Sequence, residues 1–146
     1  MKKIIIVCIV VLMSGCSNNS PIDYGINFSL IKKGNLSGSE GITESNLVIK
    51  DVTTWNSLLN KIVSIGNPIE DFTETDIDFN RFQVIAVFHK VQFGGGHTLE
   101  IKKIIENNLN LIVIVEKTGY EGINTSIEQR FHIIKILKTD KNIVFE

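Results

Sequence analysis

The strongest constraint on the fold is one helical pattern set among strand-like runs. Between Thr54 and Ile65, apolar side chains recur at i, i+3, i+4, i+7 and i+8, the spacing of one face of an amphipathic helix. These side chains are Trp55, Leu58, Leu59, Ile62 and Val63. Thr53 is the expected N-cap, and Gly66 is the expected stop. A helix with one apolar face needs a surface to cover, and we expect Trp55 to be a core residue that fixes this helix on a sheet.

The rest of the body has the apolar patterns of strands, separated by segments rich in Gly, Ser or Asn. The expected strands are Tyr24 to Lys32, Gln83 to Val91, Thr98 to Ile105, Asn110 to Glu116, Phe131 to Lys138 and Asn142 to Phe145. Gly34 to Glu44 is expected to be a loop, and Leu47 to Ile49 is a short apolar run. Because Val84 to Phe88 is apolar on both faces, we expect a central strand covered on two sides. The sequence therefore predicts an α+β fold, with one amphipathic helix packed on a mainly antiparallel β-sheet.

The first sixteen residues have the layout of an export signal. Two lysines precede the apolar run Ile4 to Leu12, which is followed by Met13-Ser14-Gly15-Cys16. This tetrapeptide resembles the lipobox of bacterial lipoproteins, with Met13 in place of the usual Leu. The resemblance implies cleavage before Cys16, a diacylglycerol on its sulfur and a lipid anchor in the bacterial cell envelope, in the outer membrane if the cell is Gram-negative. The alternative is an ordinary signal peptide with a chance cysteine.

Cleavage before Cys16 would divide the chain into a signal peptide and a mature lipoprotein. Residues 1–15 are the expected signal peptide, residues 16–22 the lipidated cysteine and a short polar tether, and residues 23–146 a single domain. Loss of two of the 15 basic residues leaves 13 against 16 acidic ones, a formal charge of −3 with no basic block that would favour nucleic acid. Because Cys8 would be removed and Cys16 acylated, the mature body would have no thiol for a disulfide or a metal. We expect no cofactor.

The order of motifs in the body resembles a known family. In chain order the motifs are Trp55-x-x-Leu58, Asp78-Phe79, the strand Val84-Ile85-Ala86-Val87, the turn Gly94-Gly95-Gly96-His97 and the segment Gln129 to Ile136. Over Val52 to Glu146 this order resembles the C-terminal domain of the PrcB family, envelope lipoproteins named for a subunit that accompanies and stabilises a secreted protease. The family's turn usually reads Thr-Gly-Gly-Tyr. The resemblance implies a non-catalytic accessory factor whose partner is an envelope or secreted protease.

Two loops hold the residues that we expect to contact a partner protein. The expected partner-binding residues are Phe93, Gly94, Gly95, Gly96, His97 and Tyr120. The three glycines permit positive φ and a wide hairpin bend, beside which the ring of Phe93 can touch a protein. Tyr120, with Ile123 and Ile127, would form a second apolar contact in the long last loop. The alternative is an ordinary surface, since singly exposed apolar residues are common.

Patterns typical of catalysis are sparse. The three histidines, His89, His97 and His132, form no His-x-x-x-His pair, and there is no Gly-x-Ser-x-Gly elbow. A lone strand histidine such as His132 is more often a hydrogen-bonded structural residue than a ligand. We therefore expect no enzyme. The alternatives are a small-ligand or glycan-binding lipoprotein that uses Tyr120 and the glycine turn, and a hydrolase whose site the sequence does not reveal.

The acidic stretch after Pro68 allows one further function. Asp71, Asp76 and Asp78 could bind a cation, but the stretch lacks the glycine and terminal Glu of an EF-hand loop, which favours a solvated loop. We expect Asp78 to accept backbone N–H groups in a turn while Phe79 packs inward. The stretch is thus expected to have a structural role.

Overall fold

The domain is built from one helix and nine strands in the part of the chain that the structure, a computed structural model, describes: residues 24–63, 69–119 and 126–146. The helix is α1 (Val52–Val63), followed by a single 3-10 turn, η1 (Ile69–Asp71). The strands are β1 (Tyr24–Ile26), β2 (Ser29–Leu36), β3 (Ser45–Ile49), β4 (Phe82–Phe88), β5 (Gln92–Phe93), β6 (Thr98–Glu106), β7 (Asn110–Thr118), β8 (Ile127–Leu137) and β9 (Asn142–Phe145).

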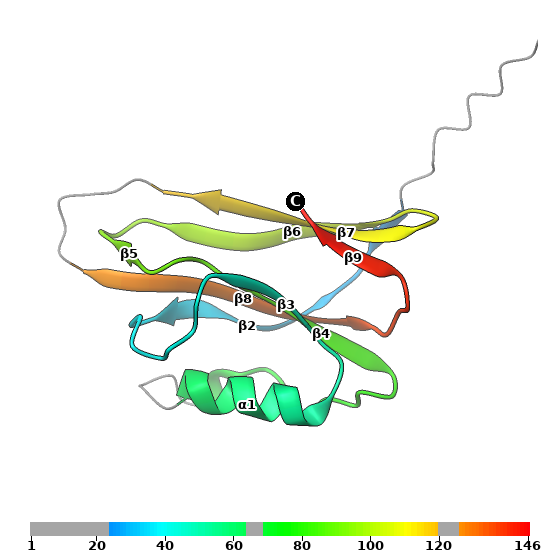
Figure 1. Cartoon of the computed structure of the whole chain (residues 1–146), viewed down its shortest axis with the longest axis horizontal. Coiled ribbons are helices and arrows are strands. Elements are labelled where there is room, and N and C mark those ends of the chain that lie inside the picture. Colours follow the sequence, from blue (N-terminus) through cyan, green and yellow to red (C-terminus); the bar gives the residue numbers. More distant parts are fainter. Residues whose placement is uncertain (1–23, 64–68, 120–125) are drawn as a thin grey trace, which may run out of the picture.

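The elements form three layers, shown edge-on in Figure 1. Helix α1 covers one face of a sheet with the strand order β2-β8-β4-β3, to which β5 is added along β8. A second sheet, with the order β1-β6-β7-β9, covers the other face. All strand pairs are antiparallel except β7 and β9. The α+β fold with mainly antiparallel strands is therefore confirmed, but the strands form two stacked sheets.

Strand β4 lies at the centre of these layers, as its two-sided apolar pattern predicts. Val84, Ala86 and Phe88 belong to the core between the first sheet and α1. Ile85 and Val87 belong to the core between the two sheets. Because side chains alternate along a strand, β4 contributes to both cores at once. Strand β8 does the same through Phe131 and Ile133 on one face and Ile134 and Ile136 on the other.

Helix α1 packs through the predicted apolar stripe. Trp55, Leu58, Leu59 and Ile62 are buried, and the partly buried Val63 packs against the same core. The N-cap is Asp51, two residues before the predicted Thr53: its carboxylate accepts the backbone N–H of Thr54 at 2.8 Å and the hydroxyl of the same residue at 2.8 Å. Both Asp and Thr are good N-cap residues, and the additional hydrogen bond from the Thr54 hydroxyl favours Asp51 over Thr53. The predicted stop, Gly66, lies outside the described residues.

The prediction of one strand from Tyr24 to Lys32 is wrong. Its first part is β1, which pairs with β6 in the second sheet, and its second part begins β2, which pairs with β8 in the first. Ile26 and Phe28 pack in the core between the sheets, whereas Leu30 is exposed and Ile31 is buried beneath α1. The chain therefore crosses from one sheet to the other. The loop predicted from Gly34 begins only after Leu36, because β2 continues to that residue.

Candidate functional site

The predicted glycine turn lies at one end of the sandwich, beside the first residues of β8. Gln92 and Phe93 form β5 and pair with Glu128 and Ile127, so Phe93 lies on a short strand and not in a loop. The N–H of Gly94 continues this pairing, donating to the carbonyl of Ser126 at 2.9 Å. Gly94 and Gly96 have φ of 95° and 94°, values that side-chain-bearing residues rarely adopt. The glycines thus let the chain turn from β5 into β6.

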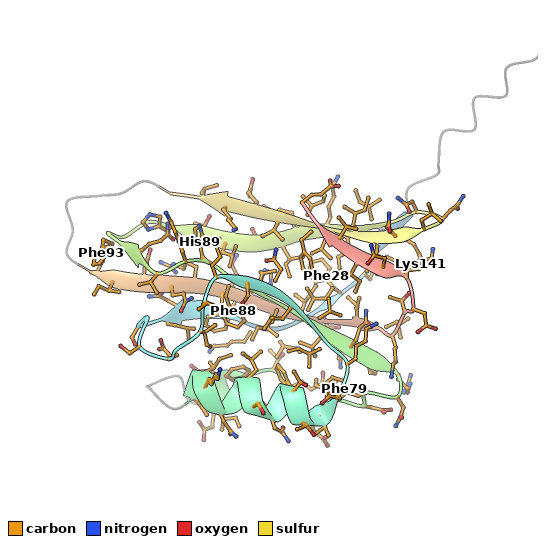
Figure 2. All side chains as sticks on the ribbon, in the orientation of Figure 1. Phe28, Phe79, Phe88, His89, Phe93 and Lys141 are labelled. Carbon is orange, nitrogen blue, oxygen red and sulfur yellow. The ribbon has the colours of Figure 1, made fainter. Side chains whose placement is uncertain are left out.

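Three apolar side chains lie exposed at this end, and we call Val91, Phe93 and Ile127 the distal patch. Phe93 is 65% exposed and pairs directly with the exposed Ile127. A Cβ placed on Gly38 would lie 2.9 Å from a methyl of Val91 and 3.5 Å from a methyl of Ile127, so both side chains lie beside the loop after β2. Figure 2 shows Phe93 at the extremity of the domain. The patch offers an exposed aromatic ring together with two aliphatic side chains.

His97 supports the turn from inside. The side chain is only 3% exposed, and its Nδ1 lies 3.1 Å from Oε1 of Glu128, which also accepts the backbone N–H of His97 at 3.2 Å. The other carboxylate oxygen of Glu128 accepts a hydrogen bond from Arg130 at 2.7 Å. Burial alone would raise the pKa of Glu128, but the hydrogen bonds from His97 and Arg130 outweigh it and hold the pKa below its ordinary value. His97 therefore fixes the glycine turn to β8 and contributes no ring surface outside.

Gly119 lies directly against His97, so a substitution of Gly119 tests how tightly His97 is packed. Gly119 has φ of 133°, and an added Cβ would lie 2.6 Å from Cδ2 and 2.7 Å from Cα of His97. We expect Gly119→Ala to lower the free energy of unfolding by about 2–4 kcal/mol, from backbone strain plus overlap. The matched control is Gly96→Ala, with φ of 94° and nothing within 4 Å, which we expect to cost about 1–2 kcal/mol. Equal losses in urea unfolding would contradict this account of His97.

His132 joins the two sheets. It lies on β8, is 4% exposed, and its Nδ1 accepts the backbone N–H of Ile101 on β6 at 2.8 Å. The prediction that His132 is a hydrogen-bonded structural residue is confirmed. Burial, reinforced by the nearby Lys33 cation, lowers its pKa to about 4, against a smaller opposing effect of Glu100. The ring is therefore neutral at physiological pH, as its role as acceptor requires.

The acidic stretch behaves as the sequence predicts at Asp78. One carboxylate oxygen accepts the backbone N–H of Asn80 at 3.0 Å, and Phe79 packs against the core beneath α1. Asp71 forms an ion pair with Lys32 at 3.0 Å. In the described ranges no group of three or more His, Cys, Asp or Glu side chains is placed to hold a metal ion.

A small cavity lies next to the glycine turn. Its volume is about 170 Å³, and its lining includes Lys33, His97 and Arg130. Ligand pockets usually occupy about 300–1,000 Å³. The larger hollows, such as one of about 430 Å³ lined by Lys50, Asp78 and Lys138, lie away from this turn. The end that carries the distal patch therefore offers more surface to a protein than room for a small ligand.

Several predicted residues fall where the structure makes no statement. Cys16, Tyr120 and Ile123 lie outside the described residues, so the expected lipidation and the second apolar contact remain predictions. Glu128 and Arg130 belong to the site although the sequence does not single them out. The contact of Glu128 with His97 joins residues 31 positions apart in the chain, and no short motif predicts such a pairing. Arg130 contacts Glu128 from two positions along the same strand. The strand predicted from Gln83 to Val91 ends at Phe88, and Val91 lies exposed beyond it.

Comparison with protein-family models, with curated proteins and with solved structures gives no match for this chain. Within the described ranges, no helix has the length and apolar character needed to cross a membrane.

Proposed function

We propose that this chain is a non-catalytic envelope lipoprotein that binds another protein through the distal patch. The observation that carries the proposal is the exposed ring of Phe93, flanked by Val91 and Ile127 at one end of the sandwich. Aromatic side chains are enriched at protein interfaces and often dominate their binding energy. A surface this small and apolar suits an anchoring contact at the centre of a larger interface.

The support beneath the patch favours recognition without large rearrangement. Phe93 is held by its pairing with β8, and the turn that follows is fixed by the buried contact between His97 and Glu128. Because the ring is presented from a strand and not from a free loop, binding requires little ordering of the backbone. Such preorganisation improves affinity by reducing the entropy lost on association.

The proposed partner class comes from the resemblance to the PrcB family. We propose an envelope or secreted protease, which this chain would stabilise or modulate from a lipid anchor at Cys16. The alternative, a small-ligand or glycan-binding lipoprotein, would need a pocket at the glycine turn. The cavity of about 170 Å³ there gives it less support than the exposed patch gives a protein partner.

Site-specific crosslinking tests the proposal. A photo-reactive phenylalanine derivative replaces Phe93 in the full chain expressed in a bacterial envelope, and the same derivative replaces Leu30 as the matched control. Leu30 is also an exposed apolar residue, at 47%, but it lies on β2 away from the patch. We expect irradiation to give a defined protein adduct from position 93 and none from position 30. Because both positions are exposed, neither change should disturb folding.

A further inference from the structure

The end of the domain opposite the distal patch carries the two most exposed large apolar side chains among the described residues. Leu109, between β6 and β7, is 78% exposed, and Leu137, the last residue of β8, is 67% exposed. We call these two residues, together with Arg81, Lys138 and Lys141, the proximal rim. Tyr24, the first described residue, lies at the same end, because it pairs with Glu106 beside the turn that holds Leu109.

Contacts between the turns hold the rim together. Lys141 forms an ion pair with Glu106 at 2.9 Å and donates to the carbonyl of Asn107 at 2.7 Å, which places the β8–β9 turn beside the β6–β7 turn. The backbone N–H of Lys138 donates to the carbonyl of Arg81 at 2.9 Å. A hollow of about 390 Å³ is lined by Gly25 of β1 and Leu137 among others, so β1 reaches the rim directly.

The two ends are well separated. Strand β8 runs from Ile127, the partner of Phe93, to Leu137. Ten residue steps at about 3.3 Å each place the ends of this strand about 33 Å apart. Figure 2 shows Phe93 and Lys141 at opposite ends of the domain.

The length of chain before β1 determines which end lies near a membrane. Eight residue steps separate Cys16 from Tyr24. At about 3.6 Å per residue, the fully extended chain spans no more than about 29 Å. A lipid on Cys16 would therefore keep Tyr24 within about 29 Å of the anchor, and the proximal rim is the surface around that end of the domain.

We propose that the proximal rim rests in the interfacial layer of the membrane that holds the anchor; this inference depends on the lipid anchor of the proposed function. Leu109 and Leu137 insert among the headgroups, and the exposed Arg81 faces the lipid phosphates. The ammonium groups of Lys138 and Lys141 are held within the protein, by the carbonyl of Phe79 at 2.8 Å and by Glu106 at 2.9 Å. These three cations are balanced by the three anions of the same turns, Asp78, Glu106 and Asp140, so the contact depends on the two leucines. A second, non-covalent contact would orient the domain, so that the distal patch points away from the membrane toward its partner.

Depth-dependent fluorescence tests this contact. The full chain, lipidated at Cys16, is reconstituted in vesicles of phosphatidylethanolamine and phosphatidylglycerol that contain a lipid-attached quencher. An environment-sensitive probe is attached to Leu109→Cys, Leu137→Cys or the matched control Phe93→Cys, each the only free thiol of the processed chain. We expect blue-shifted emission and several-fold stronger quenching at positions 109 and 137 than at position 93.

The outcomes separate the contact from the anchor. A chain that floats with the vesicles but is quenched equally at positions 109 and 93 overturns the contact and leaves the anchor intact. A chain that does not float, or a Cys16→Ala variant that floats as well as the parent, overturns the lipid anchor and the contact that depends on it. A blue shift at position 109 that grows with the amount of protein per vesicle, in vesicles without the quencher lipid, would show that a second copy of the chain covers the proximal rim. That result overturns the membrane contact.

Discussion

Replacement of Trp55 by alanine is expected to lower the free energy of unfolding by about 3–5 kcal/mol. The indole has no exposed surface and packs in the core between α1 and the first sheet. Its Nε1–H donates to the carbonyl of Thr75 at 2.7 Å, which ties the segment after η1 beneath the helix. Truncation removes the largest side chain of this core and leaves that carbonyl without its donor. Since many domains are stable by about 5–15 kcal/mol, a large fraction of the stability would be lost.

Two variants make the measurement on Trp55 specific. Trp55→Phe keeps an aromatic ring but loses the N–H donor, and we expect an intermediate cost. Asn56→Ala changes the neighbouring exposed position of α1 and should stay within about 0.5 kcal/mol of the parent. The free energies come from urea unfolding followed by circular dichroism. A loss below about 1 kcal/mol for Trp55→Ala would show that the helix does not depend on this side chain.

The second large effect is a loss of stability in mild acid. His132 has a folded-state pKa of about 4, below the ordinary value of 6.5, so the unfolded chain binds a proton more readily than the folded one. Its contribution is fully present above pH 6.5 and is lost as the pH falls from 6.5 towards 4. A depression of this size corresponds to about 3 kcal/mol. The physical cause is burial of the ring between the sheets, where its Nδ1 must stay unprotonated to accept the N–H of Ile101.

Variants of His132 and His89 show which histidine causes the loss of stability in acid. His132→Asn keeps an acceptor near the Ile101 N–H but cannot be protonated, so we expect the fall between pH 6.5 and pH 4 to flatten. The pKa of His89 is also lowered by burial, and His89→Asn measures its share of the same window. Glu100 titrates lower, because hydrogen bonds from Lys102 and Lys33 lower its pKa to about 2. An unchanged pH profile for His132→Asn would remove His132 as the cause.

Local patterns determine the parts of the fold that the sequence predicts well. The stripe from Trp55 to Ile62 depends only on helical spacing, and the two-sided apolar run from Val84 to Phe88 depends only on strand alternation and burial. Both are present as predicted. The change of sheet between Ile26 and Ser29 has no such local pattern, since neither Gly nor Pro stands between them. The same alternation of apolar and polar residues is expected whether the strands form one sheet or two stacked sheets. Strand patterns alone therefore do not distinguish the two arrangements.

The candidate site is predictable to a similar degree. Phe93 and the glycines follow from local composition, and the positive φ of Gly94 and Gly96 agrees with the predicted bend. The burial of His97 does not follow, because it depends on Glu128, 31 residues further along the chain. The two ends of the sandwich emerge only from the fold, since Leu109 lies between β6 and β7 and Leu137 ends β8 in the other sheet. Contacts of Lys141 with Glu106 and Asn107 place these two chain segments at the same end.

The most direct test of the central claim is the crosslinking yield at position 93 in the lipidated chain, measured against position 30 in the same membranes. We expect one predominant protein adduct at position 93, identified by mass spectrometry, and no comparable adduct at position 30. The absence of any protein adduct at position 93, or equal yields at the two positions, would contradict the proposal that the distal patch binds a protein.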